Sequence, residues 1–187
     1  VSGSLTSIGF QNSTKSTRRG AAGYLFRFLI HLRRFPGEAA ALLDLLTPII
    51  KTWPSEQGLM ANDLAIQVHG GYGYTRDFPV EQIYRDNRLN PIHEGTTGIQ
   101  AIDLVGRKVL RDGGNAIGLL WQRIEATAAG ACAAPDLAGH AATLRCYREK
   151  AGTTLAGLRS PSALDNATSV LRGLGHVVVA LLLLDMA

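Results

Sequence analysis

The sequence has few cysteines and no long uninterrupted apolar run. Cys132 and Cys146 are its two cysteines. They are too far apart for a Cys-x-x-Cys metal or redox site and too few for a disulfide framework. The longest apolar run, Val177 to Leu184, has eight residues, against about 20 in a membrane-spanning helix. The sequence therefore predicts a soluble protein with reduced thiols.

Acidic residues are missing from the start of the chain. Residues 1–37 contain six basic side chains, and the first acid is Glu38. The net charge of +4 belongs to this segment, since the other 150 residues carry 13 basic and 15 acidic side chains. A Ser/Thr-rich and Arg-rich start fits a nucleic-acid-binding arm, a mitochondrial transit peptide or a solvated leader. All three interpretations stay open at this point.

The sequence also lacks any sustained alternation of apolar and polar residues, which strands would require. Apolar residues instead recur at helical spacing, first over residues 21–35 and then from Leu42 to Trp53. Pro48 interrupts this second stripe and predicts a kink or a late helix start. Pro54 and Ser55 predict the next boundary, with Ser55 as N-cap of a helix over residues 56–68. That helix is expected to present Leu59, Met60, Leu64 and Val68 to the core.

Helical signals continue to the end of the chain. Gly70 predicts a left-handed cap after the helix that precedes it. Further helices are expected from Pro79 to residue 87, from Thr96 or Thr97 to the Gly113-Gly114 pair, and over residues 115–129, 135–156 and 162–186. The expected fold class is all-α, an antiparallel helical bundle. Its expected parts are an irregular basic segment, 1–37, a site-bearing helical domain, 38–112, and a helical extension, 113–187.

The stretch from His69 to Leu110 holds the residues best suited to chemistry. Glu94 stands next to Gly95 in a loop directly before a predicted helix, where a substrate would find room and free backbone N–H groups. Burial against Ile92 and Ile99 would make this carboxylate a stronger base, suited to removing a weakly acidic C–H proton. The alternative is that Glu94 only stabilises the helix end through its charge.

No metal site is predicted. His93-Glu94 lacks the second histidine that the zinc-protease motif needs, because position 97 is threonine. The Glu-x-x-His pairs of di-iron bundles are missing as well. The histidines at positions 31, 69, 140 and 176 are scattered, and we interpret them as packed or surface residues.

The glycines after His69 allow two interpretations. In Gly70-Gly71-Tyr72-Gly73 a backbone without Cβ atoms could approach a phosphate. The Rossmann and P-loop motifs are not matched, since neither a preceding strand nor a Gly-Lys-Ser/Thr ending is present. A tight corner between helix and loop explains the glycines equally well.

Taken together, these motifs resemble a known family. Its pattern is carried by QVHGGYGY from Gln67, by FPVE from Phe78, by YRD from Tyr84 and by IHEGT from Ile92, followed by Ile99-Gln100. In order and spacing these motifs resemble the C-terminal helical domain of the acyl-CoA dehydrogenases. The resemblance extends from Ala39 to Asp112, and residues 113–187 look like the helical extension of larger bacterial members. Residues 1–37 do not resemble the family.

The resemblance implies an FAD-dependent oxidoreductase that converts an acyl-CoA thioester into a trans-2-enoyl-CoA. Glu94 would be the base that removes the α-proton while the flavin accepts the β-hydride. The backbone N–H of Glu94 would hydrogen-bond the thioester carbonyl, and Gly95 would line the acyl-CoA site. These roles come from the family and agree with the independent interpretation of Glu94 as a base.

The same resemblance assigns residues to FAD. Gln67, Gly70 and Gly71 would contact the pyrophosphate or adenosine of FAD in a neighbouring subunit, and Thr96 would contact the flavin nucleotide. Position 98, often glutamine in the family, is glycine here, which removes one expected side-chain contact to FAD. His93 replaces a frequent tyrosine, which would alter the shape or polarity of the pocket.

The family also implies partners and alternatives. An acyl-CoA substrate, an electron-transfer flavoprotein or similar acceptor, and a homodimer or homotetramer are expected. No membrane span is expected. The expected location is the cytoplasm of a bacterium, ahead of the mitochondrial matrix. Two other hypotheses are a flavin-binding relative without dehydrogenase activity that binds nucleic acid through its basic start, and an inactive helical fragment without cofactor.

Overall fold

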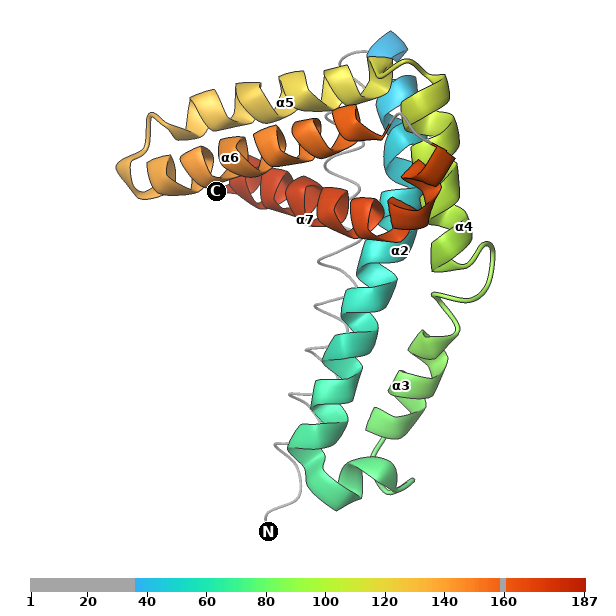
Figure 1. The fold of residues 1–187 in the computed structure, drawn as a ribbon. Helices are drawn as coiled ribbons and strands as arrows, with labels where there is room; N and C mark the ends of the chain where they lie inside the picture. Colours follow the sequence, from blue (N-terminus) through green and yellow to red (C-terminus); the bar gives the residue numbers. More distant parts are fainter. Residues whose placement is uncertain (1–35, 159–160) are drawn as a thin grey trace. The chain divides into compact units, whose positions relative to one another are not determined.

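A computed structural model describes residues 36–158 and 161–187 (Figure 1). Its elements are α2 (Pro36–His69), the 3₁₀ helix η1 (Gly70–Tyr74), α3 (Val80–Arg88), α4 (Thr97–Ile102), the π-helix η2 (Asp103–Arg111), α5 (Asn115–Ala131), α6 (Pro135–Gly157), the 3₁₀ helix η3 (Pro161–Asn166) and α7 (Ala167–Met186). No strand occurs among these residues. The all-α prediction is confirmed.

Internal contacts divide the chain into a unit Val1–Ala40 and a unit Ala41–Ala187. Of the first unit the structure describes residues 36–40, the beginning of α2. The helix expected over residues 21–35 and nearly all of the basic segment lie outside the described residues.

Helix α2 passes through both of its prolines, so the predicted late start and the boundary at Pro54-Ser55 are wrong. Pro48 cannot donate to the carbonyl four residues earlier, which is that of Asp44. The ammonium of Lys108 donates to this carbonyl at 2.6 Å and replaces the missing bond. Ser55 is no N-cap: its hydroxyl donates to the carbonyls of Lys51, at 2.9 Å, and Thr52, at 2.8 Å. A side chain from elsewhere in the chain thus satisfies the carbonyl that Pro48 leaves free, and the helix continues.

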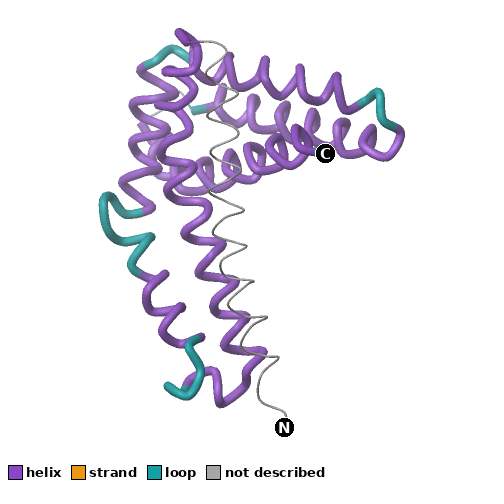
Figure 2. The backbone as a smooth tube through the Cα atoms, turned by 180° about the vertical axis from the view of Figure 1, so that it is seen from behind, coloured by secondary structure: helices purple, strands orange, loops and turns teal. Residues whose placement is uncertain are grey.

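The two halves of α2 differ in burial. Leu42, Leu45, Leu46 and Ile49 belong to the core, with exposed fractions of 6% or less. The predicted core positions of the second half are wrong, because Met60, Leu64 and Val68 are 59%, 62% and 85% exposed, and Leu59 is half-buried. Helix α3 runs back along this half, where Asn87 donates to the side-chain oxygen of Asn62 at 2.9 Å (Figure 2). It covers one face and leaves the apolar one open.

The turn and the helices before residue 113 follow the sequence closely. Gly70 has a φ of +60° and forms the predicted left-handed cap. Helix α3 begins at Val80, one residue later than expected, and Pro79 is its N-cap. The helix predicted to run from Thr96 or Thr97 to the Gly113-Gly114 pair is divided into α4 and the π-helix η2. Both terminal glycines have positive φ, as such a stop requires.

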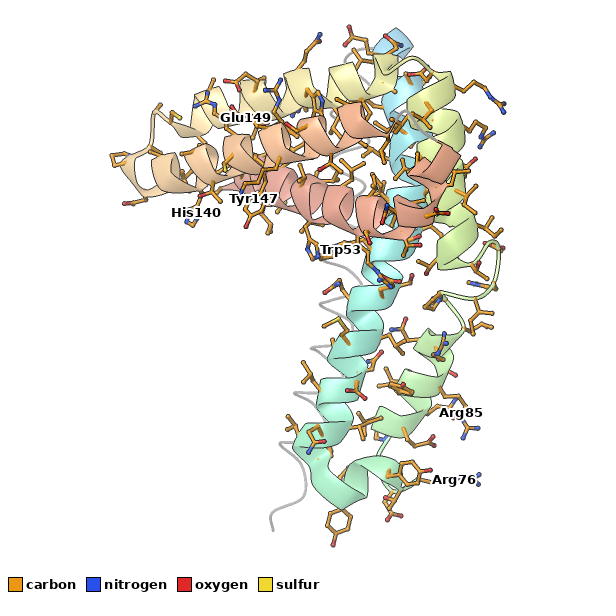
Figure 3. The ribbon with its side chains drawn as sticks, in the orientation of Figure 1. Trp53, Arg76, Arg85, His140, Tyr147 and Glu149 are labelled. Atoms are coloured by element: carbon orange, nitrogen blue, oxygen red, sulfur yellow. The ribbon has the colours of Figure 1, made fainter. Side chains whose placement is uncertain are left out.

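Helices α5, α6 and α7 lie side by side and form the main core (Figure 1). Short connections make neighbouring helices antiparallel, as in a bundle. The largest of their fully buried side chains are Leu120, Ile124, Leu171, Leu174 and Leu181. An open apolar groove of about 800 Å³ lies between α6 and α7 and is lined in part by the exposed side chains of His140, Tyr147 and His176 (Figure 3).

Helix α7 contains the longest apolar run of the sequence, Val177 to Leu184. By length and composition, one helix among the described residues, Ala163–Met186, is able to cross a membrane. Its most apolar window has a mean hydropathy of 1.8, and half of that window is buried inside the structure. The buried half packs against the helices described above.

Candidate functional site

The loop between α3 and α4 carries Glu94 in a backbone conformation that side chains disfavour. Its φ is +53°, the one positive value of a non-glycine residue among those described. Gly95 follows with a φ of +93°. Left-handed backbone at a residue other than glycine, asparagine or aspartate is uncommon and concentrates at functional sites, where the surrounding structure holds it. The loop predicted to bear the base is therefore locally strained.

Two side chains hold the carbonyls of this strained pair. Lys51 of α2 donates from its ammonium to the Gly95 carbonyl at 2.5 Å. Gln100 of α4 donates from its amide to the Glu94 carbonyl at 3.2 Å. A Cβ atom on Gly95 would lie 2.7 Å from the same amide nitrogen of Gln100. The positive φ thus favours glycine here, and an added Cβ atom would also displace the amide end of Gln100.

The start of α4 is tied to α2 as well. Thr96 is the N-cap, as predicted, and its hydroxyl accepts from the Ile99 N–H at 3.5 Å. The hydroxyl of Thr97 donates to Oε1 of Glu56 at 3.2 Å. The cap acceptor is therefore Thr96, and the carboxylate of Glu94 is not needed for that role.

Glu56 is in turn held by α7. Arg172 donates from Nε to Oε2 at 2.8 Å and from Nη2 to Oε1 at 2.9 Å, which makes a bidentate pair. Hydrogen bonding to Arg172 lowers the pKa of Glu56 below its ordinary value, against the opposing effect of burial, and the charge of Arg172 and the hydroxyl of Thr97 act in the same direction. The carboxylate is consequently ionised at neutral pH and able to accept all three bonds.

The side chain of Glu94 itself is exposed. The predicted burial against Ile92 and Ile99 is wrong for this chain, because those side chains are 49% and 59% exposed. The residues that were expected to cover the carboxylate lie open beside it instead. A dry environment for Glu94 would have to come from a surface that covers all three.

The other predicted residues, Gln67, Gly70 and Gly71, are exposed at the C-terminal end of α2. Different structural requirements explain the glycines of the turn. A Cβ atom on Gly73 would lie 2.5 Å from the Ile66 carbonyl oxygen, so this glycine serves packing. Gly70 serves the left-handed turn, whereas a Cβ atom on Gly71 would meet nothing within 4 Å. Gly71 is the glycine that neither packing nor φ explains.

The structure does not bring these residues to the Glu94 loop. The loop is bound to α2 at Lys51, and Gln67 lies 16 residues further along the same helix. At about 1.5 Å per residue this is a separation of roughly 24 Å. The two groups of predicted site residues therefore form two places on the surface of one chain.

Sequence reasoning missed the residues that hold the loop. None of Lys51, Glu56 and Arg172 was assigned to the site, because each lies in an ordinary helical pattern far from Glu94 in the sequence. The one local signal was Gln100, which lies within the family motif. Among the described residues no group of three or more His, Cys, Asp or Glu side chains is placed to hold a metal ion.

The Glu94 loop and the group of Gln67, Gly70 and Gly71 both lie within one segment that matches a family model. Residues 33–110 match the family model described as "Acyl-CoA dehydrogenase, C-terminal domain". This segment is similar to the C-terminal domain of the acyl-CoA dehydrogenase family. The resemblance inferred from the motifs is confirmed, and the enzyme class of the family is oxidoreductase.

Individual acyl-CoA dehydrogenases and related reductases are similar over the same region. The 3-methylmercaptopropionyl-CoA dehydrogenase of Ruegeria pomeroyi is 46% identical over 90 residues, 48% of this chain and 15% of the relative. The broad-specificity linear acyl-CoA dehydrogenase FadE5 of Mycobacterium tuberculosis is 40% identical over 79 residues, 42% of this chain and 13% of the relative. The acryloyl-CoA reductase (NADH) of Anaerotignum propionicum is 32% identical over 107 residues, 57% of this chain and 26% of the relative. The chain thus spans about a quarter or less of these relatives.

The residues present fit the cofactor that the acyl-CoA dehydrogenase family uses. Gly71 offers open backbone that no internal contact requires, as a close approach to a phosphate needs. Gln67 and the Thr96 hydroxyl are exposed and polar. Since the two groups lie roughly 24 Å apart along α2, they suit either the two ends of an extended dinucleotide or two different cofactor molecules.

Proposed function

We propose that this chain forms part of an FAD-dependent acyl-CoA dehydrogenase in which Glu94 is the catalytic base. The family match over residues 33–110 supports this proposal, because it contains the Glu94-Gly95-Thr96 loop. The strained backbone of that loop, with φ of +53° at Glu94, adds independent support. Conformational strain that two side chains, Lys51 and Gln100, hold in place is expected where a reactive group must keep one orientation.

The proposed chemistry is an α,β-dehydrogenation. The Glu94 carboxylate takes the α-proton of the acyl-CoA thioester, and the β-hydrogen leaves with its electron pair, so that a trans-2-enoyl-CoA results. FAD, when bound, supplies the acceptor for that hydride. The Glu94 N–H donates to the thioester carbonyl and stabilises its developing negative charge. Gly95 lines the acyl-CoA site, where an added side chain would also displace Gln100.

Gln67, Gly70 and Gly71 are proposed to hold the pyrophosphate or adenosine of FAD bound in a neighbouring subunit, and Thr96 the flavin nucleotide of its own. This division follows the family pattern, and the distance between Gln67 and the Glu94 loop is compatible with it. A homodimer or homotetramer is accordingly proposed. An electron-transfer flavoprotein or a similar acceptor would reoxidise the flavin, and the bacterial cytoplasm is the proposed location.

The exposed apolar residues around Glu94 support a second surface over the site. Ile92, Ile99 and Ile102 are all about half exposed or more. Large exposed apolar patches mark surfaces that another part or partner covers. Covering them would exclude water from Glu94 and strengthen it as a base.

The test uses the segment in a complete enzyme. Residues 33–110 replace the aligned segment of the Ruegeria pomeroyi dehydrogenase, and the flavin absorbance of the purified chimera is followed under anaerobic conditions as acyl-CoA is added. We expect the flavin to bleach. Glu94→Gln should keep the flavin and slow bleaching by at least about a hundredfold, the usual scale for a missing general base. Asp63→Asn, at an exposed position of α2, is the matched control and should bleach as the parent does.

Two results would contradict the proposal. If Glu94→Gln bleaches at the parent rate, Glu94 is not the base. If the chimera with its flavin bound is reoxidised by an enoyl-CoA but never reduced by the acyl-CoA, the reaction runs in the direction of a reductase, as the name of the Anaerotignum relative indicates for that protein.

A further inference from the structure

The helical extension contacts α2 beside the Glu94 loop. The indole N–H of Trp53 donates to Nδ1 of His176 at 3.2 Å, and the two rings meet edge to face with centroids 5.6 Å apart. Figure 3 labels Trp53 on α2 next to α7. A Cβ atom on Gly175 would collide with the Trp53 ring. Glycine at this position therefore sets how closely α7 approaches α2.

This close approach brings Arg172 to Glu56. Trp53 and Glu56 are three residues apart on α2, and Arg172 is three residues before Gly175 on α7, so each pair shares one helix face. The result is the bidentate pair described above, with donor distances of 2.8 and 2.9 Å. The extension thus reaches a carboxylate that is already engaged with the first turn of α4.

The bidentate pair fixes the orientation of that carboxylate. Oε1 of Glu56 accepts from Thr97 while both oxygens accept from Arg172. Without the planar fork of the guanidinium, the Glu56 side chain regains its rotamers and its oxygen is no longer held in front of Thr97. Thr97 is three residues after Glu94, so movement of its turn is transmitted directly to the strained backbone.

We propose that Arg172 of the extension is a positioning residue for Glu94, acting through Glu56 and Thr97. Its effect on catalysis rests on the proposed function above, whereas its effect on the loop does not. The extension is on this view part of the site and not an independent module. Arg172 touches neither substrate nor cofactor in this role.

A merely stabilising role is a poor alternative because of exposure. The side chain of Arg172 is 55% exposed, and ion pairs at such positions contribute little to folding stability. The extension contains a similar pair for comparison, in which Arg123 of α5 meets Asp185 of α7 at 3.0 Å. That pair is far from the Glu94 loop in the sequence and joins two helices of the extension only.

The first experiment needs no activity and uses the whole 187-residue chain. Hydrogen exchange of the peptide that covers residues 92–100 is measured by mass spectrometry in the parent, Arg172→Gln and Arg123→Gln. We expect about tenfold faster exchange in Arg172→Gln, the scale of one lost charge-assisted contact, and parent-like exchange in Arg123→Gln. Thr97→Val should reproduce the effect, and Thr97→Ser, which keeps the hydroxyl, should not.

The second experiment measures the reaction. In flavin-loaded enzyme that contains the full chain, the rate of flavin reduction at saturating acyl-CoA should fall about tenfold in Arg172→Gln, with flavin content and the half-saturating acyl-CoA concentration nearly unchanged. Arg172→Lys, which keeps the charge but not the fork, should recover part of the rate.

The two proposals fail separately. Parent-like exchange of the 92–100 peptide in Arg172→Gln, or an equal effect in Arg123→Gln, would overturn the positioning role. Loosened exchange together with an unchanged reduction rate would overturn it as well, since the loop would then not need Arg172 for catalysis. A parent enzyme that acyl-CoA never reduces, with loop exchange still dependent on Arg172, would refute the proposed function and leave the structural link in place.

Discussion

The site-bearing region, residues 41–112, and the extension, residues 113–187, differ in how far their large apolar side chains are exposed. Most of the large apolar side chains that remain exposed lie in the first, among them Met60, Leu64, Val68 and Ile99. The extension buries its own, as Leu120, Ile124 and Leu171 illustrate with no measurable exposure. The extension thus buries most of its large apolar side chains, whereas the site-bearing region presents apolar surface of the kind that a further part or partner covers.

The comparison also separates stability from function. The residues that hold Glu94 are polar, partly exposed and drawn from α2, α4 and α7. The residues that hold the fold are apolar and concentrated between α5, α6 and α7. Changes in the two sets should therefore have different consequences, and three measurements would break or sharpen the distinction.

The largest effect is expected in the core. Leu171→Ala should lower the free energy of unfolding by about 2–5 kcal/mol, since the removed side chain is fully buried and leaves a cavity. Met60→Ala, at a position 59% exposed, should change it by less than about 0.5 kcal/mol. Urea unfolding followed by far-ultraviolet circular dichroism, which reports helix content, measures the free energy of unfolding of both variants. Equal losses would mean that Met60 is covered in solution, for example by a second copy.

An intermediate effect is expected where α7 meets α2. Gly175→Ala should cost about 1–3 kcal/mol, because its new methyl group collides with the Trp53 ring. Gly173→Ala, two residues earlier, meets nothing within 4 Å and should be neutral or stabilise by up to about 1 kcal/mol. Thermal unfolding of the two variants gives the comparison. A tolerated Gly175→Ala would show that the spacing of these helices is not fixed by the glycine.

The smallest effect is a pH dependence at Glu56. Because its folded-state pKa is lowered by Arg172, the folded state binds this proton less readily than the unfolded state. The contribution to stability is therefore present above the ordinary pKa and is lost as the pH falls through the lowered value. At this partly exposed pair it should stay below about 1 kcal/mol.

The measurement is the stability difference between the parent and Glu56→Gln as a function of pH. We expect the parent to be more stable at neutral pH and the difference to disappear in acid. Glu149→Gln, at an exposed position of α6, serves as the control and should track the parent throughout (Figure 3). A difference that grows on acidification would contradict the assigned direction.

Much of the fold followed from patterns that are local in the sequence. Helix ends at Thr96, Pro135 and the Gly113-Gly114 pair were predicted within a few residues, because capping and left-handed glycine depend on neighbouring residues alone. The passage of α2 through Pro48 was not predictable, since the group that repairs the missing hydrogen bond, Lys108, comes from 60 residues further along the chain.

The candidate site divides in the same manner. The motif around Glu94, and through it the family, could be recognised because order and spacing are properties of the sequence. The exposure of Glu94 and the separation of Gln67 from the loop could not, because both depend on which surfaces α3 and α4 cover. The roles of Lys51 and Arg172 could not be predicted from the sequence either, because they depend on contacts between distant parts of the chain.

The sequence by itself determined that the chain is helical, where most helices end, and to which family its site motif belongs. Only the tertiary structure decided which helix faces are buried, that Glu94 has a left-handed backbone, and that α7 reaches Glu56. The physical reason is range: caps, turns and helical periods act over a few residues, whereas burial and ion pairs join residues such as Glu56 and Arg172, whose separation along the chain no local pattern encodes.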